Sequence, residues 1–218
     1  MEISMDELTP DQLLTTTRSV RKRLDFERAV SRELIAECLQ VALQAPNGSN
    51  MNSWRWLVID EPEQVAAAAA VYNAGLDDYI ESLGEAVGDR YMGAEVPRHE
   101  LLSESVDFLR KNMHRCPALL VPLFPGRTEG AGVFLQASLW GSIIQATWSF
   151  FLALRARGLG SAWTTGHLQR EPEMAELLGV PIDAYTQVGL FPIAYTIGTD
   201  FHPAYRKPVS EVLSWNRF

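Results

Sequence analysis

The sequence is poor in cysteine, with two among its 218 residues. Cys38 and Cys116 lie far apart, and neither has the spacing to other ligand residues that a structural zinc site needs. Both fall in apolar segments, where a free cysteine behaves as a small hydrophobic side chain. We therefore expect two buried thiols, with no disulfide framework and no metal.

Positive charge is also scarce. Lys and Arg number 19 against 27 Asp and Glu, which gives a net charge of −8. Binding to nucleic acid or to anionic lipid draws on a surplus of cations, because phosphate groups must be neutralised. The net negative charge therefore predicts that the chain binds neither nucleic acid nor a membrane surface.

Several catalytic and binding motifs are missing. The chain has no Gly-x-Ser-x-Gly elbow, no His-x-x-x-His pair and no phosphate-binding loop of the Walker type. No Gly-x-Gly-x-x-Gly follows a predicted strand, so a dinucleotide-binding Rossmann unit is not supported. The usual hydrolase, zinc-enzyme and Rossmann classes are disfavoured.

Long hydrophobic runs are limited to one uncharged stretch, residues 130–154. It is long enough to span a bilayer, but three glycines and several Ser, Thr and Gln interrupt it. We interpret it as a helix buried on nearly all sides, in the core or at a subunit interface. No apolar segment precedes Arg18, so we expect no secretory signal and a cytoplasmic location.

The remaining pattern mixes helices and strands in one domain, residues 1–218. Helices are predicted over 9–17, 31–45, 131–157 and 171–178. Strands are predicted over 54–60, 116–124, 161–165 and 188–198. Residues 63–115 are mostly helical, with an excursion or lid interrupted at Gly84–Gly93 and Pro97. This order predicts an α+β fold around a small sheet.

A basic segment stands out in this acidic chain. Residues 18–28 carry five cations and two anions, a local charge of +3. In Arg18-Ser19-Val20-Arg21, two guanidinium groups and a hydroxyl suit one phosphate group. A solvated, ion-paired surface would give the same pattern.

Two further segments combine glycine with polar or aromatic residues. The first, Pro46–Trp54, offers Asn side chains and a glycine that would let a planar ligand approach the backbone. The second, Gly158–Gly166, could direct backbone amides and Trp163 toward a ring. An ordinary turn and a glycine-capped helix explain each segment equally well.

The order of these motifs is more specific than any one of them. The chain contains, in this order, Arg-Ser-x-Arg, a helix ending in Ala-Pro, Asn-Gly-Ser-Asn, Gly-Leu-Gly-Ser-Ala-Trp and a final Arg-Lys-Pro. From about Thr16 to Trp215 the chain resembles the FMN-dependent nitroreductase family. The resemblance implies a nitroreductase-like α+β fold, with a small, mostly antiparallel sheet flanked by helices, and an intertwined homodimer holding FMN at its interface.

The resemblance also implies the residues that bind FMN. Arg18, Ser19 and Arg21, with Val20 between them, match the positions at the phosphate, and Arg206 matches an arginine that completes this site. The matching loop that the partner subunit packs on the flavin contains Pro46, Asn47, Gly48 and Asn50. The matching segment whose backbone amide approaches flavin N5 consists of Trp163, Thr164, Thr165 and Gly166.

Two positions depart from the family pattern. Asn52-Ser53-Trp54 stands where the family often has Gln-Pro-Trp, and Thr165 stands where bacterial members often have a glutamate. These departures put the substrate preference in doubt. Candidates for the pocket wall, which ordinary packing would also explain, are Tyr72, Tyr79, Tyr91 and Phe108.

The function implied by the resemblance is an oxidoreductase. Electrons would pass from NAD(P)H through flavin N5 to a nitroaromatic, a quinone or a similar flat acceptor, by a ping-pong mechanism. The flavin carries this chemistry, so no catalytic side chain is expected. Alternatives are a flavin-dependent dehydrogenase of a biosynthetic intermediate, a non-catalytic FMN-binding dimer, and an α+β dimer without a cofactor.

Overall fold

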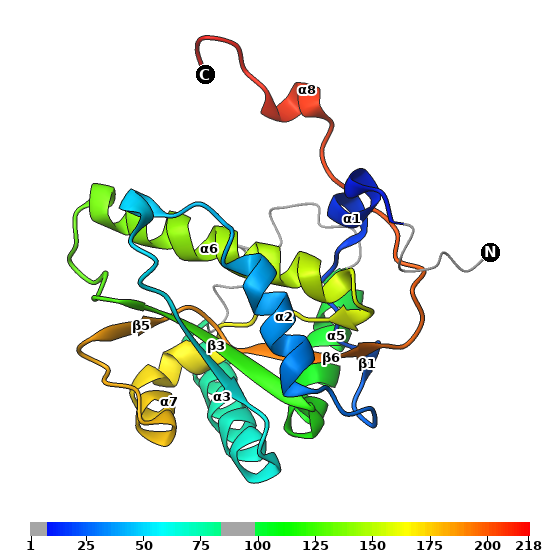
Figure 1. Ribbon diagram of the computed structural model, residues 1–218, viewed down its shortest axis with the longest axis vertical. Helices are drawn as coiled ribbons and strands as arrows, with labels where there is room; N and C mark the ends of the chain where they lie inside the picture. Colours follow the sequence, from blue (N-terminus) through cyan, green and yellow to red (C-terminus); the bar gives the residue numbers. More distant parts are fainter. Residues whose placement is uncertain (1–7, 84–98) are drawn as a thin grey trace.

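The computed structural model describes residues 8–83 and 99–218 (Figure 1). Its α-helices are α1 Pro10–Thr16, α2 Arg32–Ala42, α3 Pro62–Leu83, α5 His99–Asn112, α6 Val133–Arg155, α7 Glu171–Leu178 and α8 Val209–Val212. Its strands are β1 Leu24–Asp25, β2 Arg55–Ile59, β3 Ala118–Pro125, β4 Leu159–Gly160, β5 Tyr185–Gln187 and β6 Phe191–Thr196. Short 3-10 turns are η2 Gly48–Asn50, η3 Met113–Arg115 and η4 Gly166–Arg170.

The strands form one sheet in the order β1-β6-β3-β2, with β4 on β6 and β5 on β3. Every strand pair is antiparallel, with Val58 opposite Leu120 and Leu120 opposite Phe191. Seven of the eight residues of β3 are buried, as expected for a strand covered on both faces. The predicted α+β class and antiparallel sheet are confirmed.

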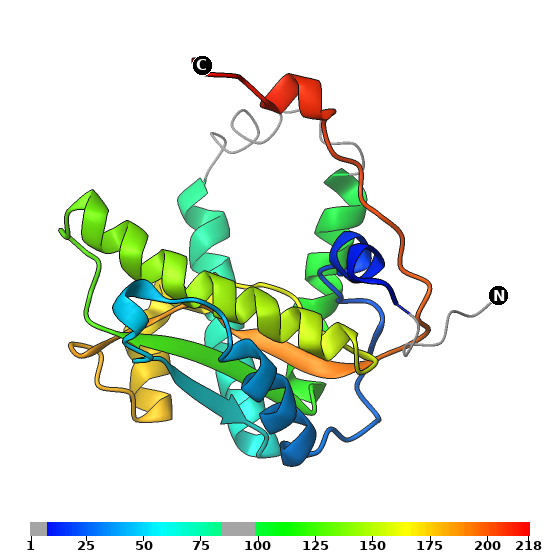
Figure 2. The same ribbon diagram turned by 45° about the horizontal axis from the view of Figure 1, so that its top comes forward.

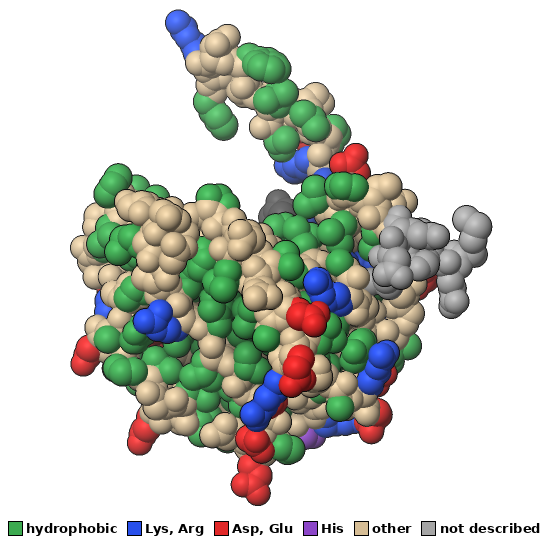
Figure 3. All heavy atoms as spheres, in the orientation of Figure 1, with side chains coloured by type: hydrophobic (Ala, Val, Ile, Leu, Met, Phe, Trp, Pro, Cys, Tyr) green, Lys and Arg blue, Asp and Glu red, His purple; other side chains and the backbone are tan. Residues whose placement is uncertain are grey.

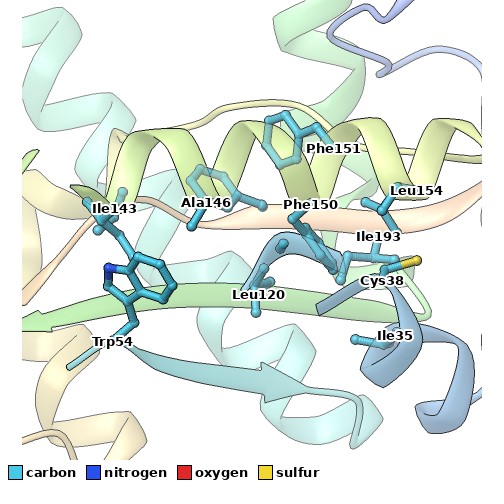
Figure 4. Packing of buried hydrophobic residues seen from close by; sticks show 14 of the residues in the cluster. Ile35, Cys38, Trp54, Leu120, Ile143, Ala146, Phe150, Phe151, Leu154 and Ile193 are labelled. Atoms are coloured by element: carbon cyan, nitrogen blue, oxygen red, sulfur yellow. The ribbon is translucent and has the colours of Figure 1, made fainter. Parts of the chain in front are cut away.

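Alternation along β3 divides the core into two layers. Leu120 faces a cluster that includes Ile35 of α2 and Phe150 of α6 (Figure 4). Leu119 faces the other cluster, which is built with α3, α5 and α7. Successive side chains of a strand point to opposite faces, so one strand supplies both clusters. The sheet therefore lies between α2 and α6 on one side and α3, α5 and α7 on the other (Figure 1).

Local signals fixed several element boundaries. The Thr9 hydroxyl accepts from the Gln12 amide at 3.2 Å, and the Gln12 side chain accepts from the Thr9 amide at 2.9 Å. These two hydrogen bonds form a capping box at the start of α1, within the helix predicted over 9–17. The Ser31 hydroxyl caps α2 by accepting from the Leu34 amide at 3.2 Å. Helix α7 covers the predicted range 171–178.

Helix α6 is not buried on nearly all sides within one chain, contrary to one of the two interpretations of the uncharged stretch. Its inner face lies in the core, but apolar side chains of its outer face are exposed. These are Val133, Phe134, Leu135, Ile144 and Trp148. By length and composition alone α6 could cross a membrane, but its inner face packs on the sheet and on α2. The interface interpretation stays a prediction.

Other expectations need correction. The strand predicted over 161–165 is instead β4, because residues 159–160 pair with β6 and the chain then turns away. Strands β1 and β5 were not predicted, and their two and three residues are too short for a sequence signal. Helix α2 ends at Ala42 rather than beside Pro46, since its last turn tightens into 3-10 hydrogen bonds. The predicted interruptions of the lid, Gly84–Gly93 and Pro97, lie outside the described residues.

The C-terminal tail extends away from the rest of the chain (Figure 2). Figure 3 shows hydrophobic side chains along it, and the exposed ones are Tyr205, Val209, Val212, Leu213, Trp215 and Phe218. Between the described residues 202–218 and the other described residues, no hydrogen bond or ion pair is formed. The path of the tail therefore depends on the segment that precedes it.

Candidate functional site

The segment after α1 runs beside β4. Ser19 forms a parallel bridge with Ser161, and the Val20 amide donates to the Ser161 carbonyl at 2.8 Å. Val20 is buried against Gly160, where an added Cβ would lie only 2.9 Å from the Val20 Cβ. Two motifs that are 140 residues apart in the sequence thus become neighbours, with Arg18 and Arg21 on either side of the buried valine.

The charge of Arg206, near the other end of the chain, acts on Arg18. Burial lowers the pKa of Arg18, and the nearby Arg206 guanidinium lowers that pKa further. Burial also lowers the pKa of Arg21. Among the described residues, no carboxylate lies within ion-pair distance of any of these three arginines. Converging cations without a protein anion form a site for an anionic ligand.

The other cations nearby have protein partners. Lys22 pairs with Glu104 at 2.8 Å, and Arg23 pairs with Asp200 at 2.6 Å. The guanidinium of Arg28 lies over the ring of Tyr195 at 3.4 Å. The basic segment therefore supplies Arg18 and Arg21 to the anion site and uses its other three cations elsewhere.

Two cavities meet at Arg21. One of about 220 Å³ contains the arginine segment and is lined by residues 18–23, Ser105 and Phe201. The other, of about 350 Å³, lies between α3, α5 and the segment 163–166. Its lining residues are Arg21, Tyr72, Leu76, Tyr79, Val106, Trp163, Thr164, Thr165, Gly166 and Gln169. An anion-binding end next to a partly apolar space suits a phosphorylated planar ligand.

The segment 163–166 is held firmly against the core. Thr164 exchanges two hydrogen bonds with Leu190: its carbonyl accepts from the Leu190 amide at 3.0 Å, and its hydroxyl donates to the Leu190 carbonyl. Trp163 packs on Phe191 with ring centroids 4.8 Å apart. Gly166 lies against α3, where an added Cβ would be 2.8 Å from Leu76 Cγ. Thr165 is left exposed beside the cavity.

The asparagine loop lies elsewhere in the chain. The Gly48 amide donates to the Ser142 hydroxyl at 2.9 Å, whereas the arginine segment lies near Arg155, thirteen residues farther along α6. At 1.5 Å per residue this separation is roughly 20 Å. One chain therefore does not bring Pro46, Asn47, Gly48 and Asn50 to the arginine cavity.

The loop is nevertheless built in an unusual conformation. Ser49, Asn50 and Asn52 have positive φ angles of 53°, 52° and 50°. The Asn47 side chain stabilises this shape by donating to and accepting from Asn52, with both distances 3.0 Å. The glycine at 48 serves the contact with α6, because an added Cβ would lie 3.1 Å from the Ser138 hydroxyl oxygen. The ligand approach expected from the sequence stays a prediction.

Comparison with known proteins identifies the fold and the family. The family model of the nitroreductase family matches residues 14–195. The chain belongs to the nitroreductase family. A Bacillus subtilis (strain 168) protein, YdgI, provisionally described as an NAD(P)H nitroreductase, is 24% identical over 94% of this chain and 96% of its own.

Solved structures of nitroreductase-like proteins share this fold. A variant of NfnB, an FMN- and NADPH-dependent nitroreductase from Sphigopyxis sp. strain HMH, has a TM-score of 0.72 at 20% identity and covers 97% of this chain and 100% of its own. Iodotyrosine deiodinase bound to FMN and 3-iodo-L-tyrosine has a TM-score of 0.69 at 20% identity, with coverage of 95% and 99%. The family and these FMN proteins support the FMN cofactor expected from the sequence.

The residues of this nitroreductase-family chain fit that cofactor. Arg18 forms no ion pair with a described carboxylate and feels the charge of Arg206, and Arg21 lines both this anion site and the larger cavity. Tyr72 and Tyr79, two of the four candidate wall residues, line that cavity. Phe108 instead packs on Phe26 at 6.2 Å, and Tyr91 lies outside the described residues.

Several residues near the site were not named as site residues from the sequence. Ser105 and Phe201 line the arginine cavity, and Arg155 and Ser161 lie beside Arg18. The Ser161 hydroxyl oxygen is buried and has no hydrogen-bond partner among the described residues. Arg155 carried a visible signal, since it is the first charged residue after the uncharged stretch. Ser161 lies inside the segment Gly158–Gly166, whereas Ser105 and Phe201 carried no signal.

Proposed function

We propose that this chain is an FMN-dependent oxidoreductase that takes electrons from NADH or NADPH and passes them, in a ping-pong sequence, to a nitroaromatic, a quinone or another flat acceptor. The observation that carries the proposal is that Arg18 and Arg21, which form no ion pair with any described carboxylate, line a cavity that shares Arg21 with the larger cavity beside it. The chemistry that FMN supplies when bound is the transfer of electrons between donor and acceptor.

The arginines would hold the phosphate end of the cofactor. A guanidinium presents a planar fork of donors, and two forks can satisfy several phosphate oxygens at once. Burial lowers the pKa of Arg18 and of Arg21, but a guanidinium is so strongly basic that it stays charged at neutral pH. A phosphate dianion would relieve the repulsion between Arg18 and Arg206 as it binds.

The segment 163–166 would form one wall of the ring site. The two hydrogen bonds between Thr164 and Leu190 prevent this wall from moving away, so its backbone donors are oriented before a ligand arrives. The described lining residues of this cavity include no carboxylate, imidazole or thiol. Burial raises the pKa of the Tyr72 phenol to about 12, so that hydroxyl stays protonated. The chain's part is therefore to position and to donate hydrogen bonds, with no general base of its own among these residues.

A second copy of the chain would complete the site. Pro46, Asn47, Gly48 and Asn50 lie roughly 20 Å along α6 from the arginine cavity of their own chain, but they form an ordered, exposed loop. The loop contacts α6 through the Gly48–Ser142 hydrogen bond, and the same helix carries the exposed apolar side chains of its outer face. We propose a homodimer in which this face is covered and each loop reaches the partner's cavity.

The test is an absorbance spectrum followed by an anaerobic titration. Purified protein, or protein mixed with FMN and desalted, should show flavin absorbance near roughly 450 nm. Addition of NADH or NADPH should bleach it, and a quinone or nitroaromatic added afterwards should restore it. Failure to retain FMN would refute the proposal.

The same titration separates the alternatives. Flavin that neither nucleotide bleaches would favour a dehydrogenase that takes electrons from a biosynthetic intermediate. Flavin that is reduced but never reoxidised by an acceptor would favour a non-catalytic FMN-binding dimer. Steady-state rates at several fixed acceptor concentrations should give parallel double-reciprocal lines, and intersecting lines would contradict the ping-pong sequence.

A further inference from the structure

Arg155 is a charged residue in an otherwise apolar place. It is the last residue of α6, it is 4% exposed, and no other charged residue occurs in that helix. Its Nη2 donates to the Thr199 carbonyl at 3.0 Å, and its guanidinium carbon lies 4.6 Å from the centroid of the Phe201 ring. Burying a charge is costly unless the charge makes specific interactions. The hydrogen bond to Thr199 and the contact with the Phe201 ring are such interactions.

Arg23 acts on the same segment from the other end of the chain. Its Nε donates to the Ile197 carbonyl at 2.7 Å, and its Nη2 donates to Asp200 Oδ1 at 2.6 Å. Its guanidinium carbon lies 4.2 Å from the centroid of the Phe201 ring. Two cations therefore contact one aromatic ring, and together they bind the backbone on both sides of residue 198.

The clamped segment 197–201 connects the core to the phosphate site. Phe201 lines the arginine cavity together with Arg18, and a smaller space of about 10 Å³ lies between Phe201, Arg18 and Arg155. Arg206 follows five residues later. Residues 202, 203, 205 and 206 are exposed, and the one side-chain hydrogen bond of Arg206 among the described residues goes to its neighbour Tyr205. The position of Arg206 therefore depends on the segment before it.

We propose that Arg155 and Arg23 are positioning residues that act through Phe201: they hold segment 197–201 so that Arg206 meets Arg18 at the cofactor phosphate. This inference rests on the proposed FMN function. The two cations do not need to touch the cofactor. Their effect is to fix the point from which the tail begins, so that less conformational entropy is lost when Arg206 is ordered on the phosphate.

The proposed positioning role of Arg155 and Arg23 affects only the binding of the phosphate group. A ligand that lacks the phosphate therefore tests it. Riboflavin has the ring and the sugar alcohol of FMN but no phosphate. Dissociation constants for FMN and riboflavin should be measured by flavin fluorescence for the parent chain, Arg155→Met, Phe201→Leu and Arg206→Ala. Each variant should bind FMN at least about 10-fold more weakly and riboflavin within about twofold of the parent, because only the phosphate contacts depend on the clamp. Phe201→Tyr keeps the aromatic ring and should therefore retain the FMN affinity of the parent chain.

Two controls show whether the effect passes through Arg206. In the double variant Arg155→Met/Arg206→Ala, the loss of FMN affinity should be no larger than with Arg206→Ala alone, because coupled residues are not additive. Arg157 lies two residues from Arg155, but its guanidinium donates to the Ala153 carbonyl and pairs with Glu37. The variant Arg157→Met should therefore leave both affinities unchanged.

Either of two results would overturn the inference. One is equal weakening of FMN and riboflavin in Arg155→Met and Phe201→Leu, which would indicate general damage to the fold. The other is unchanged FMN affinity in both variants. A parent chain that binds FMN no better than riboflavin would overturn the phosphate site itself, and the proposed function with it. The first two results leave the proposed function standing.

Discussion

Gly75 of α3 and Gly166 of η4 face each other with no room for a side chain between them. A Cβ on Gly75 would lie 2.2 Å from the Gly166 carbonyl oxygen, and the obstacle is backbone rather than a movable side chain. This close approach lets α3 serve as a wall of the larger cavity. It also fixes the segment 163–166, which would contact the flavin ring.

Substitution of Gly75 by alanine should therefore cost stability despite alanine's higher helix propensity. We expect a loss of about 2 kcal/mol or more in the free energy of unfolding, since α3 must shift to relieve the clash. Denaturant unfolding followed by circular dichroism would measure it. Ala70→Ser adds one atom at an exposed position of the same helix and should change stability by less than about 0.5 kcal/mol. A neutral Gly75→Ala variant would contradict the packing.

His167 should make stability depend on pH. Burial lowers the pKa of its imidazole from 6.5 to about 4, while the Glu171 charge and the Gln187 side chain oppose this shift more weakly. Neither ring nitrogen has a hydrogen-bond partner of normal geometry among the described residues, which agrees with a neutral buried ring.

The sign follows from proton uptake. Between pH 6.5 and 4 the unfolded chain binds a proton at residue 167 that the folded chain does not, so stability falls as the pH falls through this range. The total loss from this residue is about 3 kcal/mol. Unfolding at pH 7.5 and pH 4.5 should show a smaller difference for His167→Gln than for the parent chain. The exposed His114→Gln variant should retain the parent's pH dependence.

Removal of the arginine pair should release the cofactor. Arg18→Ala/Arg206→Ala should bind FMN at least about 100-fold more weakly, because two charge-assisted contacts to the phosphate are lost. Equilibrium dialysis would measure this loss. Arg32→Ala removes the same charge from an exposed ion pair with Asp60 and should leave FMN affinity unchanged. Retention of FMN by the double variant would refute the phosphate site.

The exposed face of α6 should be an interface. Ile144 and Trp148 lie one turn apart on this helix, and a glutamate at either position would place a charge in the proposed dimer contact. Light scattering during size-exclusion chromatography should then shift from the mass of two chains to the 24.4 kDa of one. Flavin retention should fall with it, because the partner's asparagine loop is lost.

A control for this prediction lies in the opposite helical layer. Ile80→Glu changes an exposed apolar residue of α3 and should leave the mass unchanged. A parent chain that elutes as a single chain at all concentrations would refute the dimer.

The helices were predictable because their signals are local. The capping box of Thr9 and Gln12, the Ser31 cap and the glycine that ends α7 each act within a few residues. The strand predicted over 161–165 was wrong because pairing is not local: Gly160 pairs with Ala194, and Thr164 turns aside to bind Leu190. Short strands such as β1 exist only because a longer strand is present to pair with them.

The candidate site divides in the same way. The residues of the three motifs could be named from the sequence, because glycine, asparagine and arginine occur there in a recognisable order. Their spatial grouping could not be derived from spacing. Arg18 and Arg21 join segment 163–166 within one chain, whereas the asparagine loop stays at the far end of α6. Arg155 and Phe201 belong to no motif, and only the folded backbone places them beside Arg18.

By itself the sequence determined an acidic α+β chain with a local surplus of positive charge at residues 18–28. It could not determine which of those five cations are available to a ligand. Tertiary structure decided this by pairing Lys22 with Glu104 and Arg23 with Asp200, and by placing Arg28 over Tyr195. It also brought Arg206 to Arg18 across 188 positions. The physical reason is that the availability of a charge depends on its neighbours in space, and folding selects those neighbours from distant parts of the chain.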